Sequence, residues 1–240
     1  MPVKTIIADG STISRNPSRD GVSWAYRWLD EQGALLREES DVLPVSAFGA
    51  PVVGNNTAEL LALVEALAEL PNGWGGIVMT DSQNTLGRFF DSWATHNVPE
   101  WLRVRMRETR NRLSIGRCTP VLLDGHPTEA HLARGTGKKG NPCSIHNVVC
   151  DRLAGEEGLA WLAARDALCG EPRRNGTLRE RYFDRIALES LPPRAFRHLQ
   201  RRVLDEATRD GALEITQSED DRTGSWFLRW RIKSALAGDR

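Results

Sequence analysis

The segment Thr5-Ile6-Ile7-Ala8-Asp9-Gly10-Ser11 places an acidic residue directly after a run of mostly apolar residues. Residues 3–8 have the composition of a short buried strand, so Asp9 is expected to leave that strand at one edge of a sheet. A lone carboxylate in an apolar setting is costly unless a partner compensates its charge. We therefore expect Asp9 to share a cation with other acidic residues.

Three further carboxylates have comparable settings. Asp81 follows the apolar residues 77–80, Glu59 lies in Asn-Asn-Thr-Ala-Glu-Leu-Leu, and Asp151 lies in His-Asn-Val-Val-Cys-Asp-Arg. If these segments converge on Asp9, their oxygen atoms form a site suited to Mg²⁺ or Mn²⁺.

The segments after Asp9 predict an antiparallel meander. Val22, Trp24, Tyr26 and Trp28 alternate with smaller or polar residues, which is typical of a half-buried strand whose aromatic residues belong to the core. A turn at Glu31-Gln32-Gly33 allows residues 34–43 to return antiparallel. Residues 3–43 are therefore expected to form three consecutive strands.

The next hundred residues alternate helical and strand patterns. Leucines and valines at helical spacing follow Thr57, and Pro71-Asn72-Gly73 ends that helix. We expect strands at 77–80 and 120–123 and helices at 82–93, 101–113 and from 144 or 146 to 168. The fold class is therefore α/β, with a mixed five-stranded sheet flanked by helices.

A polar segment with proline and glycine, residues 171–176, predicts a boundary between a domain at 1–170 and a smaller one at 171–240. Expected helices at 178–191 and 194–209 precede expected strands at 213–216 and 226–232. This order suggests a small α+β accessory domain of winged-helix-like type. Arg194, Arg197 and Arg201 share one helix face there, and the first interpretation of this face is a solvated charged surface. The alternative is an additional nucleic-acid or protein contact through this domain.

Composition constrains the setting of the protein. The chain has 240 residues with 32 basic and 32 acidic side chains, so any basic surface must be local. No apolar run approaches the ~18 residues that a membrane span requires. The first residues have no apolar signal-peptide core, and the four cysteines form no CxxC pair. We expect a cytoplasmic monomer with no membrane partner.

The four acidic motifs resemble those of type 1 ribonuclease H, in the same chain order, over roughly residues 3–168. The resemblance implies a ribonuclease H-like fold and hydrolysis of the RNA strand of RNA–DNA hybrids. It implies two Mg²⁺ ions about 3.5–4 Å apart, with Mn²⁺ as a possible substitute, and products with 5′-phosphate and 3′-hydroxyl ends. The implied metal ligands are Asp9, Glu59, Asp81 and Asp151.

The resemblance extends to amide side chains that read the substrate. Asn16, Asn55, Asn56 and Gln83 match family positions that contact the RNA strand. An amide both donates to and accepts from a 2′-hydroxyl, the group that distinguishes RNA from DNA. These four residues are the expected substrate-binding set.

His126 resembles the family histidine that moves protons or assists product release. About twenty residues separate it from the Asp151 helix, more than in the best-known bacterial members, and His131 within this insertion is an alternative. The same insertion carries Lys138 and Lys139 between glycines, so we expect a mobile basic flap that contacts phosphates. The segment at residues 93–101 is short and not basic. The lysine-rich segment that some bacterial relatives have at this place is therefore expected to be absent.

Other interpretations stay open at this point. A different nuclease or strand-transferase of the same fold would share the carboxylates but not the amide set. The second alternative is a non-catalytic nucleic-acid-binding module. The presence of all four acids argues against it, because acids that face phosphates weaken nucleic-acid binding. Cys143, His146 and Cys150 suggest a zinc site, although Cys150 at helical spacing also suits the core. Asn147 is expected either to cap the last helix or to orient the site.

Overall fold

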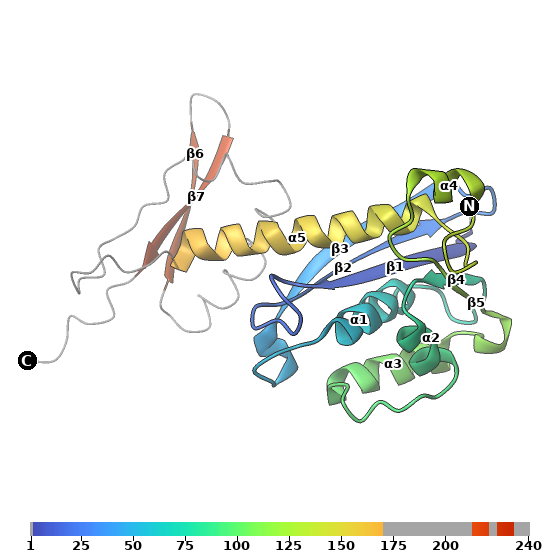
Figure 1. Cartoon of the computed structure of the whole chain (residues 1–240). Coiled ribbons are helices and arrows are strands. Elements are labelled where there is room, and N and C mark those ends of the chain that lie inside the picture. Colours follow the sequence, from blue (N-terminus) through green and yellow to red (C-terminus); the bar gives the residue numbers. More distant parts are fainter. Residues whose placement is uncertain (1, 170–212, 221–224, 233–240) are drawn as a thin grey trace, which may run out of the picture. The chain divides into compact units, whose positions relative to one another are not determined.

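The computed structural model describes residues 2–169, 213–220 and 225–232. Its main sheet has the strand order β3-β2-β1-β4-β5 (Figure 1). The β1–β2 and β2–β3 pairs are antiparallel, whereas β1–β4 and β4–β5 are parallel. The predicted mixed sheet with an N-terminal meander is confirmed. The strands are β1 (Thr5–Thr12), β2 (Gly21–Leu29), β3 (Leu35–Pro44), β4 (Ile77–Thr80) and β5 (Thr119–Leu122).

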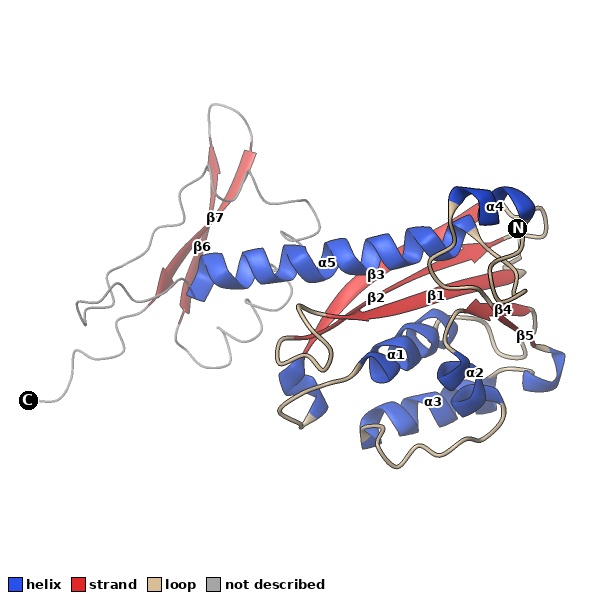
Figure 2. Cartoon of the chain, viewed as in Figure 1, coloured by secondary structure: helices blue, strands red, loops and turns tan. Residues whose placement is uncertain are grey.

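Helices cover both faces of this sheet (Figure 2). Figures 1 and 2 show α1, α2 and α3 on one side of the strands and α5 on the other. A short helix, α4, lies in the insertion before α5. The helices are α1 (Asn55–Ala68), α2 (Gln83–Phe90), α3 (Glu100–Arg112), α4 (Glu129–Arg134) and α5 (Ile145–Cys169), with 3-10 turns η1 (Val45–Phe48) and η2 (Ile115–Arg117).

The two faces of the sheet carry separate apolar clusters, because successive side chains of a strand point to opposite faces. Ile6 packs with the residues of α1 and α3, and its neighbour Ile7 packs with Cys150 and Leu153 of α5. Both isoleucines are fully buried. The strand that carries Asp9 is therefore held from both sides.

The apolar stripe of α1 explains its position under the sheet. Leu60, Leu63 and Leu67 are fully buried, and Trp28 of β2 donates from Nε1 to the carbonyl of Ala66 at 3.0 Å. The guanidinium of Arg112 donates to carbonyls at the C-terminal end of the helix, including that of Leu67 at 3.1 Å. These contacts satisfy carbonyls that a helix end otherwise leaves without a partner.

Two local features differ from the sequence predictions. β1 continues to Thr12, so Asp9 lies within the strand rather than after it. The reason is that β2 pairs with β1 up to Thr12, whereas the pairing with β4 ends at Ile7. Helix α4 was not predicted, although Thr128 before Glu129 is a usual helix start, and Thr128 caps this helix.

The residues after α5 are described only in part. β6 (Leu213–Asp220) and β7 (Ser225–Ile232) form an antiparallel pair, which agrees with the predicted strands. The predicted helices at 178–191 and 194–209, with Arg194, Arg197 and Arg201, lie outside the described residues. Contacts divide the chain into units at 1–159 and 160–240, and the boundary at residue 170 stays a prediction. Among the described helices, none has the length and apolar character that a membrane span requires.

Candidate active site

Three of the four predicted carboxylates come together. Asp9 from β1, Glu59 from α1 and Asp81 from the end of β4 offer oxygen atoms that all lie within 4.8 Å of one another. Asp9 and Asp81 meet because β1 and β4 are parallel neighbours. Glu59 reaches them because Gly10 lets α1 approach β1: a Cβ at Gly10 would lie 2.2 Å from the carbonyl oxygen of Ala58.

The hydrogen bonds around this cluster leave oxygen atoms available for a cation. Asp9 Oδ1 accepts from the Gly10 amide at 2.7 Å, and Glu59 Oε1 accepts from the Asn55 side chain at 2.9 Å. Glu59 Oε2 is buried and receives no hydrogen bond from any described residue. A buried carboxylate oxygen without a donor, beside two other acids, fits a divalent cation, which prefers oxygen ligands.

Electrostatics point to the same conclusion. Burial, followed by the charges of Asp81 and Asp151, raises the pKa of Asp9 well above its usual range. Burial and the charges of Asp9 and Asp81 raise the pKa of Glu59 to about 10. A bound cation would relieve both the repulsion and the loss of hydration.

Asn147 is a site residue that the sequence left undecided. It lies in the first turn of α5, is 2% exposed and directs its side-chain amide to Asp81 Oδ2 at 3.5 Å. Burial raises the pKa of Asp81, while the Asn147 hydrogen bond and the charge of His126 oppose that rise. Ser144, rather than Asn147, accepts from a backbone amide at the start of α5, since its Oγ receives the His146 N–H at 3.2 Å. The contact therefore favours the orienting role over the capping role.

Asp151 lies apart from the group of three. Its side chain is 51% exposed, and its Oδ2 lies 3.8 Å from Nδ1 of His126. It projects from the surface of α5, whereas the other three acids converge between β1, α1 and β4. Of the four acids that were predicted to converge, three therefore do so, and Asp151 lies at the rim of the site beside His126.

The structure separates the two candidate histidines. His126 follows β5 by four residues and has a positive φ of 54°. His131 belongs to a capping box of α4: its Nδ1 accepts from the Thr128 amide, and its own amide donates to Thr128 Oγ1, both at 3.3 Å. Proximity to Asp151 therefore favours His126.

The predicted substrate-binding amides lie around the start of α1. Asn16 Oδ1 accepts from the Asn55 amide at 3.2 Å, and Asn84 of α2 donates to Asn56 Oδ1 at 3.4 Å. Asn55 also contacts Glu59, as described above. Gln83 is exposed as the first residue of α2, directly after Asp81-Ser82. The amides thus adjoin the carboxylates.

The insertion between β5 and α5 is folded onto the end of β5. Asp124, which is 8% exposed, accepts from the Lys139 amide at 3.1 Å, and its own amide donates to the Pro142 carbonyl at 2.9 Å. A Cβ at Gly137 would lie 2.2 Å from the carboxylate carbon of Asp124, so the loop passes very close to this acid. Lys138 and Lys139 are exposed on the loop held in this way. The predicted mobility of the segment stays a prediction.

The zinc interpretation finds no support in the described residues. Asp9, Glu59 and Asp81 are the group of potential metal ligands found there, and Cys143, His146 and Cys150 do not form another. His146 Nδ1 lies 3.0 Å from Nη1 of Arg27, and Cys150 is fully buried in the core beneath α5. Cys150 is therefore a core residue, as its helical spacing also suggested.

Comparison with known proteins identifies the family. A ribonuclease H of Nitratidesulfovibrio vulgaris is 33% identical over 157 residues, which cover 64% of this chain and 89% of the relative. The chain belongs to the ribonuclease H family. A ribonuclease H of Chlorobium phaeovibrioides is 28% identical over 150 residues, covering 62% of this chain and 91% of that protein. A scan against models of protein families finds no match.

The chain is also similar to solved structures of two proteins. The crystal structure of RNase H1 from the halophilic archaeon Halobacterium salinarum NRC-1 is 22% identical to this chain in sequence, with a TM-score of 0.42. The match covers 64% of this chain and 95% of the archaeal protein. The LC11-RNase H1 in complex with RNA/DNA hybrid has 17% identity and a TM-score of 0.43, and covers 65% and 98%. The group of Asp9, Glu59 and Asp81 is consistent with a metal-dependent catalytic site in a member of this family.

Proposed function

We propose that this chain is an endoribonuclease that hydrolyses the RNA strand of RNA–DNA hybrids, giving 5′-phosphate and 3′-hydroxyl ends. The observation that carries the proposal is the group of Asp9, Glu59 and Asp81, whose oxygens lie within 4.8 Å of one another in a chain of this family. Such a group is costly to hold together unless the protein uses it to bind cations.

The chain's own residues supply the ligands and the proton transfer. Asp9, Glu59 and Asp81 would hold a divalent cation, and Asp151 would join them when a second ion binds; we propose Mg²⁺, with Mn²⁺ as a substitute. When bound, the ions activate water and stabilise the leaving 3′-oxygen. His126 lies beside Asp151 at the rim, where a proton can pass to solvent or to the leaving strand. Asn147 keeps the Asp81 carboxylate oriented.

The amides provide the choice of substrate. Asn16, Asn55, Asn56 and Gln83 lie at the entrances to the first two helices, next to the acids. Each has donor and acceptor capacity for a ribose 2′-hydroxyl. Exposed Lys138 and Lys139, on the loop tied to Asp124, are proposed to contact phosphates. This set favours a hybrid nuclease over a strand-transferase of the same fold.

Cleavage of labelled hybrid, duplex RNA and duplex DNA in the presence of Mg²⁺ tests the function. The native chain should cut only the RNA strand of the hybrid, and Asp81→Asn should lower kcat by about 10³-fold or more because a charged ligand is lost. Asp91→Asn, which changes an exposed acid directly after α2, is the matched control and should keep native activity. Full activity in Asp81→Asn would overturn the proposal.

A further inference from the structure

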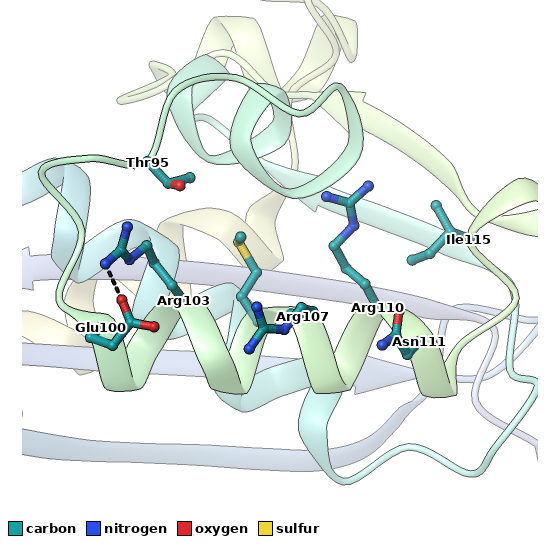
Figure 3. A pocket seen from close by; sticks show the side chains of 8 residues that line it. Thr95, Glu100, Arg103, Arg107, Arg110, Asn111 and Ile115 are labelled. Atoms are coloured by element: carbon teal, nitrogen blue, oxygen red, sulfur yellow. Dashed lines mark hydrogen bonds and ion pairs between the residues drawn. The ribbon is translucent and has the colours of Figure 1, made fainter.

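Helix α3 presents an arginine-lined hollow outside the carboxylate site. The hollow has a volume of about 550 Å³, and Figure 3 shows the side chains of Arg103, Arg107 and Arg110 beside it, with Thr95 on the facing loop. We call it the arginine groove. It is lined by Thr95, Glu100, Arg103, Met106, Arg107, Arg110, Asn111 and Ile115.

The positive charge of the groove is largely unneutralised. Arg105, on another face of α3, pairs with Glu65 of α1, and Arg103 pairs with Glu100 at the start of the groove. Within residues 2–169, Arg107 and Arg110 have neither an ion pair nor a hydrogen bond, unlike Arg103 and Arg105. Although the protein has equal numbers of acidic and basic residues, two guanidinium groups in one concave site thus have no acidic partner among the described residues. This arrangement suits a ligand with repeated negative charges.

The groove begins at the end of α1 that carries the substrate-binding amides. Near the start of α3, Trp101 packs against Phe48, with ring centroids 5.8 Å apart, and Phe48 precedes α1. At the other end, Arg112 reaches the last carbonyls of α1. The two helices therefore run in the same direction, as Figure 1 also shows. The groove extends from the Asn55–Asn56 end of α1 toward its C-terminal end.

A buried arginine joins the wall of the groove to the substrate site. Arg88 of α2 is 7% exposed, donates to the Asn56 carbonyl at 3.4 Å and donates to Asn97 Oδ1 at 3.1 Å. Asn97 belongs to the same loop as Thr95, which lines the groove. The groove and the amides of the active site are thus connected by one side chain.

We propose that the arginine groove binds the phosphate backbone of the hybrid beyond the nucleotides held at the carboxylates. This inference rests on the proposed function. Arg103 and Arg110 are seven residues apart on one helix, so their Cα atoms are separated by about 10 Å along its axis. Bases in one strand lie about 3.4 Å apart along a duplex, so the groove matches roughly three nucleotides. Guanidinium groups bind phosphates through pairs of hydrogen bonds.

Hybrid binding should be measured in the full chain with Asp81→Asn added to every protein to prevent cleavage. The Arg107→Ala/Arg110→Ala double variant should bind a long hybrid about tenfold more weakly at low salt, and its log–log salt dependence should become shallower by about 2. A short hybrid that spans only the carboxylates and amides should bind both proteins equally. Arg105→Ala, which removes one positive charge from another face of α3, is the control and should keep the native salt slope.

Three results would overturn the proposal that the arginine groove binds the hybrid backbone. They are an unchanged salt slope in the double variant, an equal loss on the short hybrid, or an equal effect of Arg105→Ala. Failure of the proposed function would give a different result: the native chain, which keeps Asp81, would not cleave the hybrid at all. Far-UV circular dichroism and thermal unfolding of the double variant check its fold; both changed side chains lie on the helix surface, so a native Tm is expected.

Discussion

The carboxylates of Glu59 and Asp9, which are proposed to bind the cation, should destabilise the folded protein when no cation is bound. Both are acids with raised pKa values, that of Glu59 to about 10, so the cation-free folded protein holds protons that the unfolded chain releases. The unfolded value for Glu59 is 4.5. Between these values the folded state binds more protons, and its stability therefore falls as pH rises.

In EDTA, the free energy of unfolding should decrease from about pH 5 to about pH 9. Glu59→Gln should flatten this decline and stabilise the cation-free protein by about 1–2 kcal/mol at pH 8, because folding then no longer requires a proton to be taken up at this position. Urea unfolding at a series of pH values measures both effects. Mg²⁺ should stabilise the native protein more than the variant, and a native stability that does not change with pH would contradict this account.

The two histidines of the insertion should separate function from structure. His126→Ala should lower kcat by about 100-fold with little change in KM, because we propose that this side chain, which lies beside Asp151, moves a proton. His131→Ala should leave kcat near native and cost about 0.5–1 kcal/mol through loss of half the α4 capping box. Steady-state kinetics and thermal unfolding of both variants check this. The reverse pattern would assign the role to His131.

At the level of elements, the insertion depends on a close contact between Asp124 and Gly137. Gly137→Ala would place a Cβ 2.2 Å from the Asp124 carboxylate carbon, so the loop that carries Lys138 and Lys139 must move. We expect kcat/KM on hybrid to fall about tenfold, mainly through KM, with a weaker salt dependence of binding.

Gly116→Ala is the matched control for this change. A Cβ there has nothing within 4 Å, and the residue lies in η2, away from the insertion. Native kinetics are expected for it. If Gly137→Ala also behaves as native, the contact with Asp124 does not position the lysines for substrate.

In the molecule as a whole, every proposed site residue lies between Asp9 and Asp151 in the sequence. The buried apolar clusters on the two faces of the main sheet also lie before residue 160. We propose residues 1–170 as the catalytic domain and 171–240 as an accessory one. A chain ending at residue 170 should keep kcat within about threefold of the full chain, because a domain with its own core folds alone. Loss of cooperative unfolding in the shorter chain would contradict the boundary.

Local sequence determined much of this protein. Alternating or continuous apolar runs fixed the strands, the leucine spacing fixed α1, and short polar motifs marked the acids and amides, because these signals depend on neighbouring residues. The departures have two origins: the length of β1 depends on its pairing with β2, which no pattern within β1 encodes, whereas α4 is too short for a clear periodic pattern.

Only the tertiary structure decided which distant residues meet. Asn147 contacts Asp81 from 66 positions away, and Arg88 joins Asn56 to Asn97 across 32 and 9 positions. The same holds for Asp151, which stands beside His126 rather than among the other acids. Such contacts depend on how helices dock on the sheet and not on the pattern within any segment. The sequence thus established the acids and amides of the site, while the docking of the helices decided their arrangement and formed the arginine groove.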